Sequence, residues 1–218
     1  MLSEGDNFPS VCYSLRNFTD KNDRILKYAW KDNIGWHTET IDENGDRVGY
    51  SSLAIDSDDN PHLSYYNPEE NELRYAWKDV SGWHIEMFDD VGYACYTSLA
   101  LDDDGYPPHI SYSEGGVDEV RYACKDAAGW HIETFDTVDA IYTSLSLDSA
   151  GYPHVSYVLN GEKYLKYAWK DASGWHSERV VGGGCGTDEG CLWEVHSLAL
   201  GGNDMPPISV IAEVESKI

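Results

Sequence analysis

The chain has little positive charge and no long apolar run, and these two shortages exclude several classes of protein. Its 218 residues carry 15 lysines and arginines against 39 aspartates and glutamates, a formal net charge of −24. Nucleic acids and anionic membrane surfaces bind positive patches, so we expect neither as a partner. No apolar stretch approaches the roughly 20 residues of a membrane helix, so membrane insertion is not expected. Cations and neutral ligands such as sugars remain as possible partners.

The first residues show neither a basic segment nor an apolar one, so no secretory signal is visible. The cysteines still favour an oxidising compartment. Cys185 and Cys191 lie in a glycine-rich loop without a neighbouring histidine, which predicts a small disulfide rather than a metal site. We therefore expect an extracellular or cell-surface location. The pairing of Cys12, Cys95 and Cys124 stays open.

What the sequence does contain is a repeat. The motif pair YAWKD and GWH recurs at a near-constant interval, with the tryptophan of GWH at Trp36, Trp83, Trp130 and Trp175. Each copy is followed by a segment such as SSLAID and then by one such as PHLSY. A unit of this length cannot bury its own apolar face, so four such units must stack on one another.

Each unit divides into four short segments that alternate between apolar and polar residues. In the third unit these segments are 97–102, 108–113, 119–126 and 129–136. The period of two and the abundance of Val, Ile, Tyr, Trp and Thr predict strands, and no segment has the pattern of an amphipathic helix. An Asp followed three residues later by Gly predicts a type I turn between the third and fourth strands.

The two faces of each sheet are expected to differ in size. In the third unit the large face would carry Leu99, Leu101, Ile110, Tyr112, Val120 and Tyr122, and the small face Ser98, Ala100, Ser111 and Ala123. A large face against the next small face allows stacked sheets to reach interior packing density.

Four-stranded antiparallel units stacked radially form a β-propeller. The repeat resembles that of secreted bacterial and archaeal β-propeller proteins, with relatives among lectin-like and sialidase-like propellers. The resemblance covers almost the whole chain. It implies an all-β fold, a four-bladed β-propeller of four-stranded antiparallel blades in a single domain.

The phase of the repeat suggests how the ring closes. Segment 9–42 matches the last three strands of a unit and segment 196–201 matches a first strand, so we expect them to share one blade. The other blades are expected at 51–89, 97–136 and 143–181. Segment 206–218 is then a surplus strand or tail. Such a strand invites exchange with a neighbouring molecule. The alternative is that the chain was cut from a longer array.

Aromatic and acidic residues gather where first strands begin and fourth strands end. This location predicts a ligand-binding site made of Tyr50, Tyr96, Tyr142, Trp193, His196, Asp42, Asp89 and Asp136. Tyrosine and tryptophan near carboxylates suit the apolar face and the hydroxyls of a sugar. The alternative is that the tyrosines only fill one end of the central channel.

The remaining polar repeats favour structural explanations. Seven of the eight histidines recur at equivalent positions, as packing would require, whereas a metal site needs ligands that converge on one point. Basic residues on third strands and glutamates on fourth strands predict ion pairs across each hairpin. The acidic turn with Asp56, Asp58 and Asp59 could hold calcium but lacks the EF-hand pattern, so we expect no cofactor.

These features together predict a non-catalytic, extracellular propeller that binds carbohydrate or protein, or assembles into a surface component or filament through its extra strand. The alternative is a sialidase-like glycosidase. The Asp-box pattern S-x-D-x-G-x-x-W of sialidases is absent from the sequence, which weakens that alternative.

Overall fold

The computed structural model describes residues 8–16, 24–45, 49–92, 94–102, 107–161, 164–182, 191–201, 204 and 206–213. Everything said below of the structure refers to these residues. They contain no helix that could cross a bilayer. All regular secondary structure among them is β-strand, as the alternating sequence pattern predicts.

The strands form successive antiparallel sheets, which we call blades. Blade 1 contains β1 (Ser10–Arg16), β2 (Arg24–Lys31) and β3 (Trp36–Gly45). Blade 2 contains β4 (Gly49–Ile55), β5 (Pro61–Asn67), β6 (Glu72–Asp79) and β7 (Gly82–Asp90). Blade 3 contains β8 (Ala94–Leu101), β9 (Pro108–Glu114), β10 (Glu119–Asp126) and β11 (Gly129–Asp136). Blade 4 contains β12 (Ala140–Leu147), β13 (Pro153–Leu159), β14 (Tyr164–Asp171) and β15 (Gly174–Gly182). A half-blade pairs β16 (Cys191–Leu198) with β17 (Ile208–Glu213).

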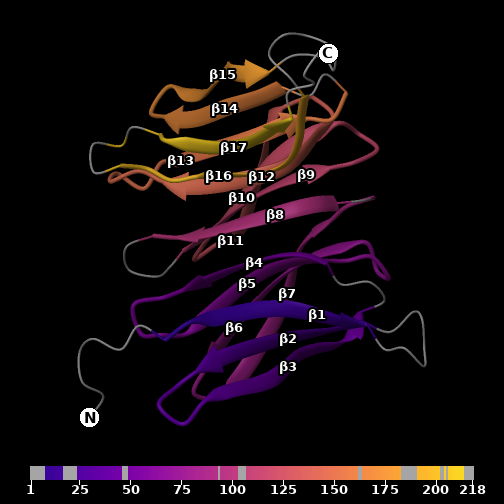
Figure 1. Ribbon diagram of the computed structural model, residues 1–218, viewed down its shortest axis with the longest axis vertical. Helices are drawn as coiled ribbons and strands as arrows, with labels where there is room; N and C mark the ends of the chain where they lie inside the picture. Colours follow the sequence, from indigo (N-terminus) through magenta and orange to yellow (C-terminus); the bar gives the residue numbers. More distant parts are fainter. Residues whose placement is uncertain are drawn as a thin grey trace.

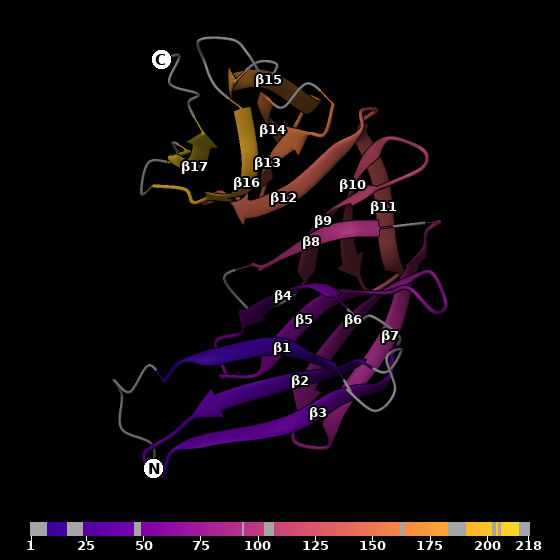
Figure 2. The ribbon, with the colours of Figure 1, turned by 45° about the vertical axis from the view of Figure 1, so that its right-hand side comes forward.

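The blades follow one another along the long axis of the molecule, with blade 1 at one end and blade 4 with the half-blade at the other (Figure 1). The first strands lie side by side, since β8 contacts both β4 and β12. The fourth strands β7 and β11 lie on the outside of the resulting fan (Figure 2). This is the blade arrangement of a β-propeller, and it confirms the fold class expected from the repeat.

The core lies between the blades. The second strands β5, β9 and β13 are buried along their whole length because a neighbouring blade covers each of their faces. One core cluster joins Tyr75 and Phe88 of blade 2 to Leu99 and Ile110 of blade 3, and another joins Val120 and Tyr122 of blade 3 to Leu145 and Val155 of blade 4. Stability therefore depends on contacts between neighbours, as in other repeat proteins.

The expected division into a large and a small face is wrong. In blade 3, Tyr122 lies opposite Ser111, and Ala123 lies opposite Ile110. Directly opposite residues of an antiparallel pair share a face. Tyr122 is therefore on the face with Ser111, and Ala123 is on the face with Ile110. On the first of these faces the large residue lies on β10 and the small one on β9. On the second face the order is reversed.

The structure does not show the ring closed. Segment 196–201 was expected beside β1, but β16 pairs with β17 in a sheet of its own, with Leu198 opposite Ile208. Part of the expected surplus segment 206–218, the strand β17, thus pairs with a strand nearby in the sequence. Pairing two segments a few residues apart costs less loop-closure entropy than pairing the two ends of the chain.

Candidate functional site

The predicted tyrosines form a column along the first strands. The ring centroids of Tyr50 and Tyr96 are 4.3 Å apart, and those of Tyr96 and Tyr142 are 4.0 Å apart. All three residues have positive φ, at 56°, 57° and 55°. Each lies in a β-bulge, where the pairing with the second strand shifts register. This conformation is rare for a bulky side chain and costs of order 1–3 kcal/mol.

Hydrogen bonds from the next blade hold the column in place. The Thr97 hydroxyl donates to the backbone carbonyl of Tyr50 at 2.8 Å, and the Thr143 hydroxyl donates to that of Tyr96 at 2.9 Å. Burial, with hydrogen bonding to Tyr142, raises the pKa of Tyr96 well above its usual range. Because Tyr96 is covered on both sides, the column offers a ligand chiefly the ring of Tyr50, which is 41% exposed.

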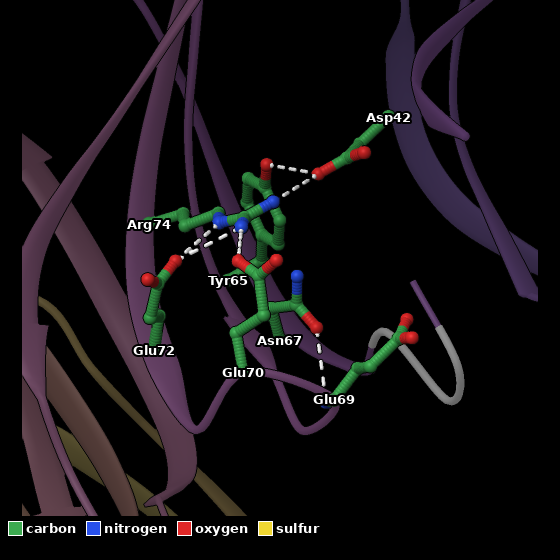
Figure 3. A network of polar contacts seen from close by, with 7 residues as sticks. All are labelled: Asp42, Tyr65, Asn67, Glu69, Glu70, Glu72 and Arg74. Carbon is green, nitrogen blue, oxygen red and sulfur yellow. Dashed lines mark hydrogen bonds and ion pairs between the residues drawn. The ribbon is translucent and has the colours of Figure 1, made fainter. Parts of the chain in front are cut away.

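The predicted aspartates instead join each blade to the next. Asp42 of blade 1 accepts hydrogen bonds from the Tyr65 hydroxyl at 2.8 Å and from Arg74 Nη1 at 3.0 Å, both in blade 2 (Figure 3). Arg74 also contacts Glu70 and Glu72. Asp89 repeats these contacts with Tyr112 and Arg121, and Asp136 repeats them with Tyr157 and Lys166.

This aspartate network gives the second-strand tyrosines their electrostatic character. Burial raises the pKa of the Tyr65 hydroxyl, and the neighbouring Asp42 carboxylate raises it further. The tyrosine therefore stays protonated and donates its hydrogen bond. Neither the tyrosine column nor these carboxylates line either of the two cavities described below. Trp193 and His196 lie on β16, but their side chains are outside the described part of the chain.

The repeated lysines also bridge blades, and this corrects the expected pairing across each hairpin. Lys78 of blade 2 lies 2.5 Å from Glu39 of blade 1. Lys125 contacts Glu86, and Lys170 contacts Glu133, across the next two interfaces. The strand register explains the difference, since Glu86 lies opposite Tyr75 and not opposite a basic residue of its own hairpin. These charges therefore stabilise the stack of blades.

Aromatic rings surround each bridging lysine. Lys78 Nζ lies 5.2 Å from the ring centroid of Trp30 and 6.0 Å from that of Trp83. Lys125 lies in the same way 5.2 Å from Trp77 and 5.7 Å from Trp130. Such cation–π contacts add to the ion pair and hold the lysine in a fixed place.

A cavity of about 300 Å³ opens at the first of these interfaces. It is lined by Tyr28 and Trp30 of blade 1 and by Asp59, Asn60, Pro61, Lys78, Asp79 and Val80 of blade 2. We call it the Trp30 pocket. Two aromatic rings and several hydrogen-bonding groups converge in it, which is the composition of a small-molecule site. This pocket was not predicted from the sequence, because its residues come from turns and strands of two different repeats.

The turn that supplies Asp59 and Asn60 is held by Asp56. Its carboxylate accepts hydrogen bonds from the backbone N–H groups of Asp58 at 2.9 Å and Asn60 at 2.7 Å. Its second oxygen accepts one from the Asn60 side chain at 3.0 Å. Asp56 thus closes the turn as a backbone-capping residue would. Among the described residues no group of three or more potential metal ligands occurs.

The Trp30 pocket has no complete equivalent between blades 3 and 4. The repeat places Cys124 at the position of Trp30, Gly151 at that of Asp59 and Tyr152 at that of Asn60. The backbone is conserved in shape, since Gly151 and Asp59 both have positive φ, at 79° and 64°. Between blades 2 and 3 the rings of Tyr75 and Trp77 are present, but the matching turn at 103–106 lies outside the described residues.

A second cavity, of about 420 Å³, lies between β8 and β12 beside the turn at 148–151. Its lining includes Leu101, Leu147 and Asp148 but no aromatic ring. Because an aromatic ring is the usual contact for the apolar face of a sugar, this cavity suits a carbohydrate less well than the Trp30 pocket.

The histidines take part in structural contacts. The buried rings of His62, His109 and His154 hydrogen bond through Nδ1 to the hydroxyls of Tyr75, Tyr122 and Tyr167. Near the start of β3, β7, β11 and β15, His37, His84, His131 and His176 pair with Asp32, Asp79, Asp126 and Asp171 before the strand, at 2.9 to 3.1 Å. These seven rings therefore do not converge on a metal.

Among the described side chains, Cys12 and Cys124 are free thiols. Burial raises the pKa of Cys12, so this thiol is kept protonated and unreactive. The predicted Cys185–Cys191 disulfide is not tested, because Cys185 and the side chain of Cys191 lie outside the described part of the chain, as does the side chain of Cys95.

The geometry defines an all-β protein of propeller blades with an aromatic and polar pocket between two of them. No protein-family model and no curated protein matches the chain. Among solved structures, the chain is similar to a variant of the lectin AAL from Aleuria aurantia in complex with Fucα1-6GlcNAc. That similarity has a TM-score of 0.55 at 14% identity, over 95% of this chain and 72% of the lectin. A protein from Lactobacillus plantarum aligns with a TM-score of 0.44 at 13% identity, over 78% of this chain and 54% of that one. At these identities the first likeness shows the propeller fold alone.

Proposed function

We propose that this chain is a non-catalytic carbohydrate-binding propeller, and that the sugar lies in the Trp30 pocket between blades 1 and 2. The observation that carries the proposal is the convergence of Trp30, Asp59, Asn60 and Lys78 on one cavity of about 300 Å³. Indole rings pack against the C–H face of a sugar, while carboxylate, amide and ammonium groups bind its hydroxyls. The fold shared with a lectin supports the same class of ligand.

Charge favours a neutral sugar. The chain carries a net charge of −24, and two of the pocket residues, Asp59 and Asp79, are acidic. A sialylated or sulfated glycan would be repelled by this field. Because the AAL complex contains Fucα1-6GlcNAc, neutral fucosylated glycans are the first probes.

The state of Asp79 suits a hydrogen-bond acceptor for a sugar. Hydrogen bonds from Ser81 and His84 lower the pKa of Asp79 to about 2. Asp79 is therefore ionised at neutral pH and can accept hydrogen bonds from sugar hydroxyls. It does not meet the requirement of a glycosidase for a general acid whose pKa is raised, so that it is protonated at the working pH.

A second candidate surface is the tyrosine column, because backbone strain repeated at three equivalent residues is typical of a functional position. Only Tyr50 presents an exposed ring there. We rank this surface below the Trp30 pocket and keep the extracellular location as a proposal that rests on the Cys185 and Cys191 pair.

A glycan array tests the proposed function. The wild type is expected to bind neutral glycans, and Asp59→Gly is expected to lose that signal. The replacement copies Gly151 of blade 4 and suits the positive φ of 64°, so the fold should survive it. Asp58→Ala, which copies Ala150 in the same turn, is the matched control and should bind normally. Loss of binding in Tyr50→Ala, with Asp59→Gly unaffected, would move the site to the tyrosine column.

A further inference from the structure

We propose that copies of this chain associate head to tail, with the open face of blade 1 in one copy against the outer strands of blade 4 in another. The three interfaces within the chain share one set of contacts. Each end of the described array presents one half of that set without its counterpart.

The shared set has two parts. A lysine at the end of each third strand pairs with a glutamate of the preceding blade, as in Lys78–Glu39, Lys125–Glu86 and Lys170–Glu133. A tryptophan five residues after that lysine packs edge-on against a tyrosine of the preceding blade. Its ring centroid lies 5.7 Å from Tyr28 for Trp83, 5.5 Å from Tyr75 for Trp130 and 5.5 Å from Tyr122 for Trp175.

Blade 1 presents the lysine and tryptophan half. Lys31 and Trp36 occupy the positions of Lys78 and Trp83 in the repeat. Trp36 is 56% exposed, whereas Trp83, Trp130 and Trp175 are half-buried. Lys31 is exposed and forms no ion pair with any described residue. Val11 and Leu15 of β1 are also exposed, although the matching strands of the other blades are buried throughout.

Blade 4 presents the complementary half. Glu178 occupies the position of Glu39 and Glu133, is exposed, and lacks an ion-pair partner in the described part of the chain. Val180 and Val181 follow it and are 46% and 40% exposed, where Ile41 of blade 1 is buried. The half-blade packs mainly on the inner strands β12 and β13, and within the described residues it has no third or fourth strand that covers β15.

The two halves fit one occupant, a second copy of this chain. One end of the array presents the cation of Lys31 beside the indole of Trp36. The other end presents the carboxylate of Glu178 beside apolar side chains. Residues at the same repeat positions form the three Lys–Glu pairs between blades inside the molecule. The halves differ and lie at opposite ends of the array (Figure 1). Contact between copies is therefore heterologous, and it produces rings or open filaments rather than two-fold dimers.

One rearrangement follows from the repeat. The incoming β1 and the resident β17 are both second strands, so they compete for the same edge of β16. The β16–β17 pairing is irregular, with register shifts on both sides of Glu194. Docking therefore displaces β17, and deletion of residues 206–218 is expected to strengthen association.

A charge exchange tests this proposal, with the mass of the species measured by sedimentation velocity over a range of concentrations. The wild type is expected to form multimers, while Lys31→Glu alone and Glu178→Lys alone stay monomeric. An equimolar mixture of the two variants should associate again, because each contact then joins one acid to one base. Glu69→Lys changes an exposed acid on a blade 2 turn by the same charge and should associate like the wild type.

Two results would overturn the proposal. A wild type that is monomeric at every concentration would show that the halves do not bind between copies. A mixture no larger than its separate variants would show that Lys31 and Glu178 do not meet across molecules, as expected if one chain closes on itself. Circular dichroism of each variant establishes that it is folded, so a loss of association reflects the contact.

Discussion

At the scale of single residues, the repeated polar side chains of this protein are largely used between blades. Asp42, Glu39 and Lys78 all bridge blades 1 and 2. The sequence shows these residues as equivalent in every repeat but does not show which repeat supplies the partner. Their positions were therefore predictable, whereas their partners depend on the twist between neighbouring sheets.

Removal of the Asp42 charge should weaken the first interface. Asp42 is 5% exposed and binds both Tyr65 and Arg74. Asp42→Asn leaves Arg74 without its buried carboxylate, so we expect the free energy of unfolding to fall by about 3 kcal/mol in urea titrations. Glu70→Gln, at the exposed partner of the same arginine, should cost less than about 1 kcal/mol. Equal losses in the two variants would contradict the interface role of Asp42.

The buried histidines should make stability fall in mild acid. Burial lowers the pKa of His62 and of His109 below the usual value near 6.5. As the pH drops below about 6.5, the unfolded chain binds protons that the folded protein refuses, so the free energy of unfolding decreases. Above that pH both states are neutral and the effect vanishes.

Urea unfolding at pH 7 and pH 5.5 measures this dependence. The double variant His62→Gln with His109→Gln should lose less stability between the two pH values than the wild type does, although it starts lower because the bonds to Tyr75 and Tyr122 are lost. An unchanged difference in the double variant would mean that other groups govern the acid response.

At the scale of elements, strand existence was the most predictable feature. The predicted segments 108–113, 119–126 and 129–136 match β9, β10 and β11 almost to the residue, because alternation and the Asp-to-Gly turns fix their ends. The bulges in the first strands were not predictable. Nothing in the residue type of Tyr50, Tyr96 or Tyr142 favours a positive φ, and hydrogen bonds from the next blade help to stabilise it at Tyr50 and Tyr96.

Those hydrogen bonds provide a test at the same scale. The Thr97 hydroxyl donates to the Tyr50 carbonyl and accepts from Ser64. Thr97→Val keeps the shape but leaves buried polar groups unpaired, so we expect a loss of about 2 kcal/mol in the free energy of unfolding. Thr134→Val, at an exposed hydroxyl bound to Glu119, should be nearly neutral. If the two variants behave alike, the strained column does not depend on Thr97.

At the scale of the whole molecule, the sequence predicted the propeller fold but not the Trp30 pocket. The period of the repeat fixes the number and order of blades, since each unit needs a neighbour to cover it. The pocket, in contrast, exists because Trp30 belongs to one repeat and Asp59 and Lys78 to the next. The predicted closure of the ring is not shown by the structure, because β16 pairs with β17 and not with β1, and both pairings satisfy the strand pattern.

The central claim is that a neutral glycan binds between blades 1 and 2 against Trp30. Fluorine NMR of protein labelled with 5-fluorotryptophan tests it directly, because Trp30 can be assigned among the 8 tryptophan resonances through its disappearance in Trp30→Phe. Titration with the glycan selected on the array should shift the Trp30 resonance and leave that of Trp175, which packs against Tyr122 between blades 3 and 4, in place. A titration that moves Trp175 or no tryptophan at all, while the glycan binds, would contradict the account.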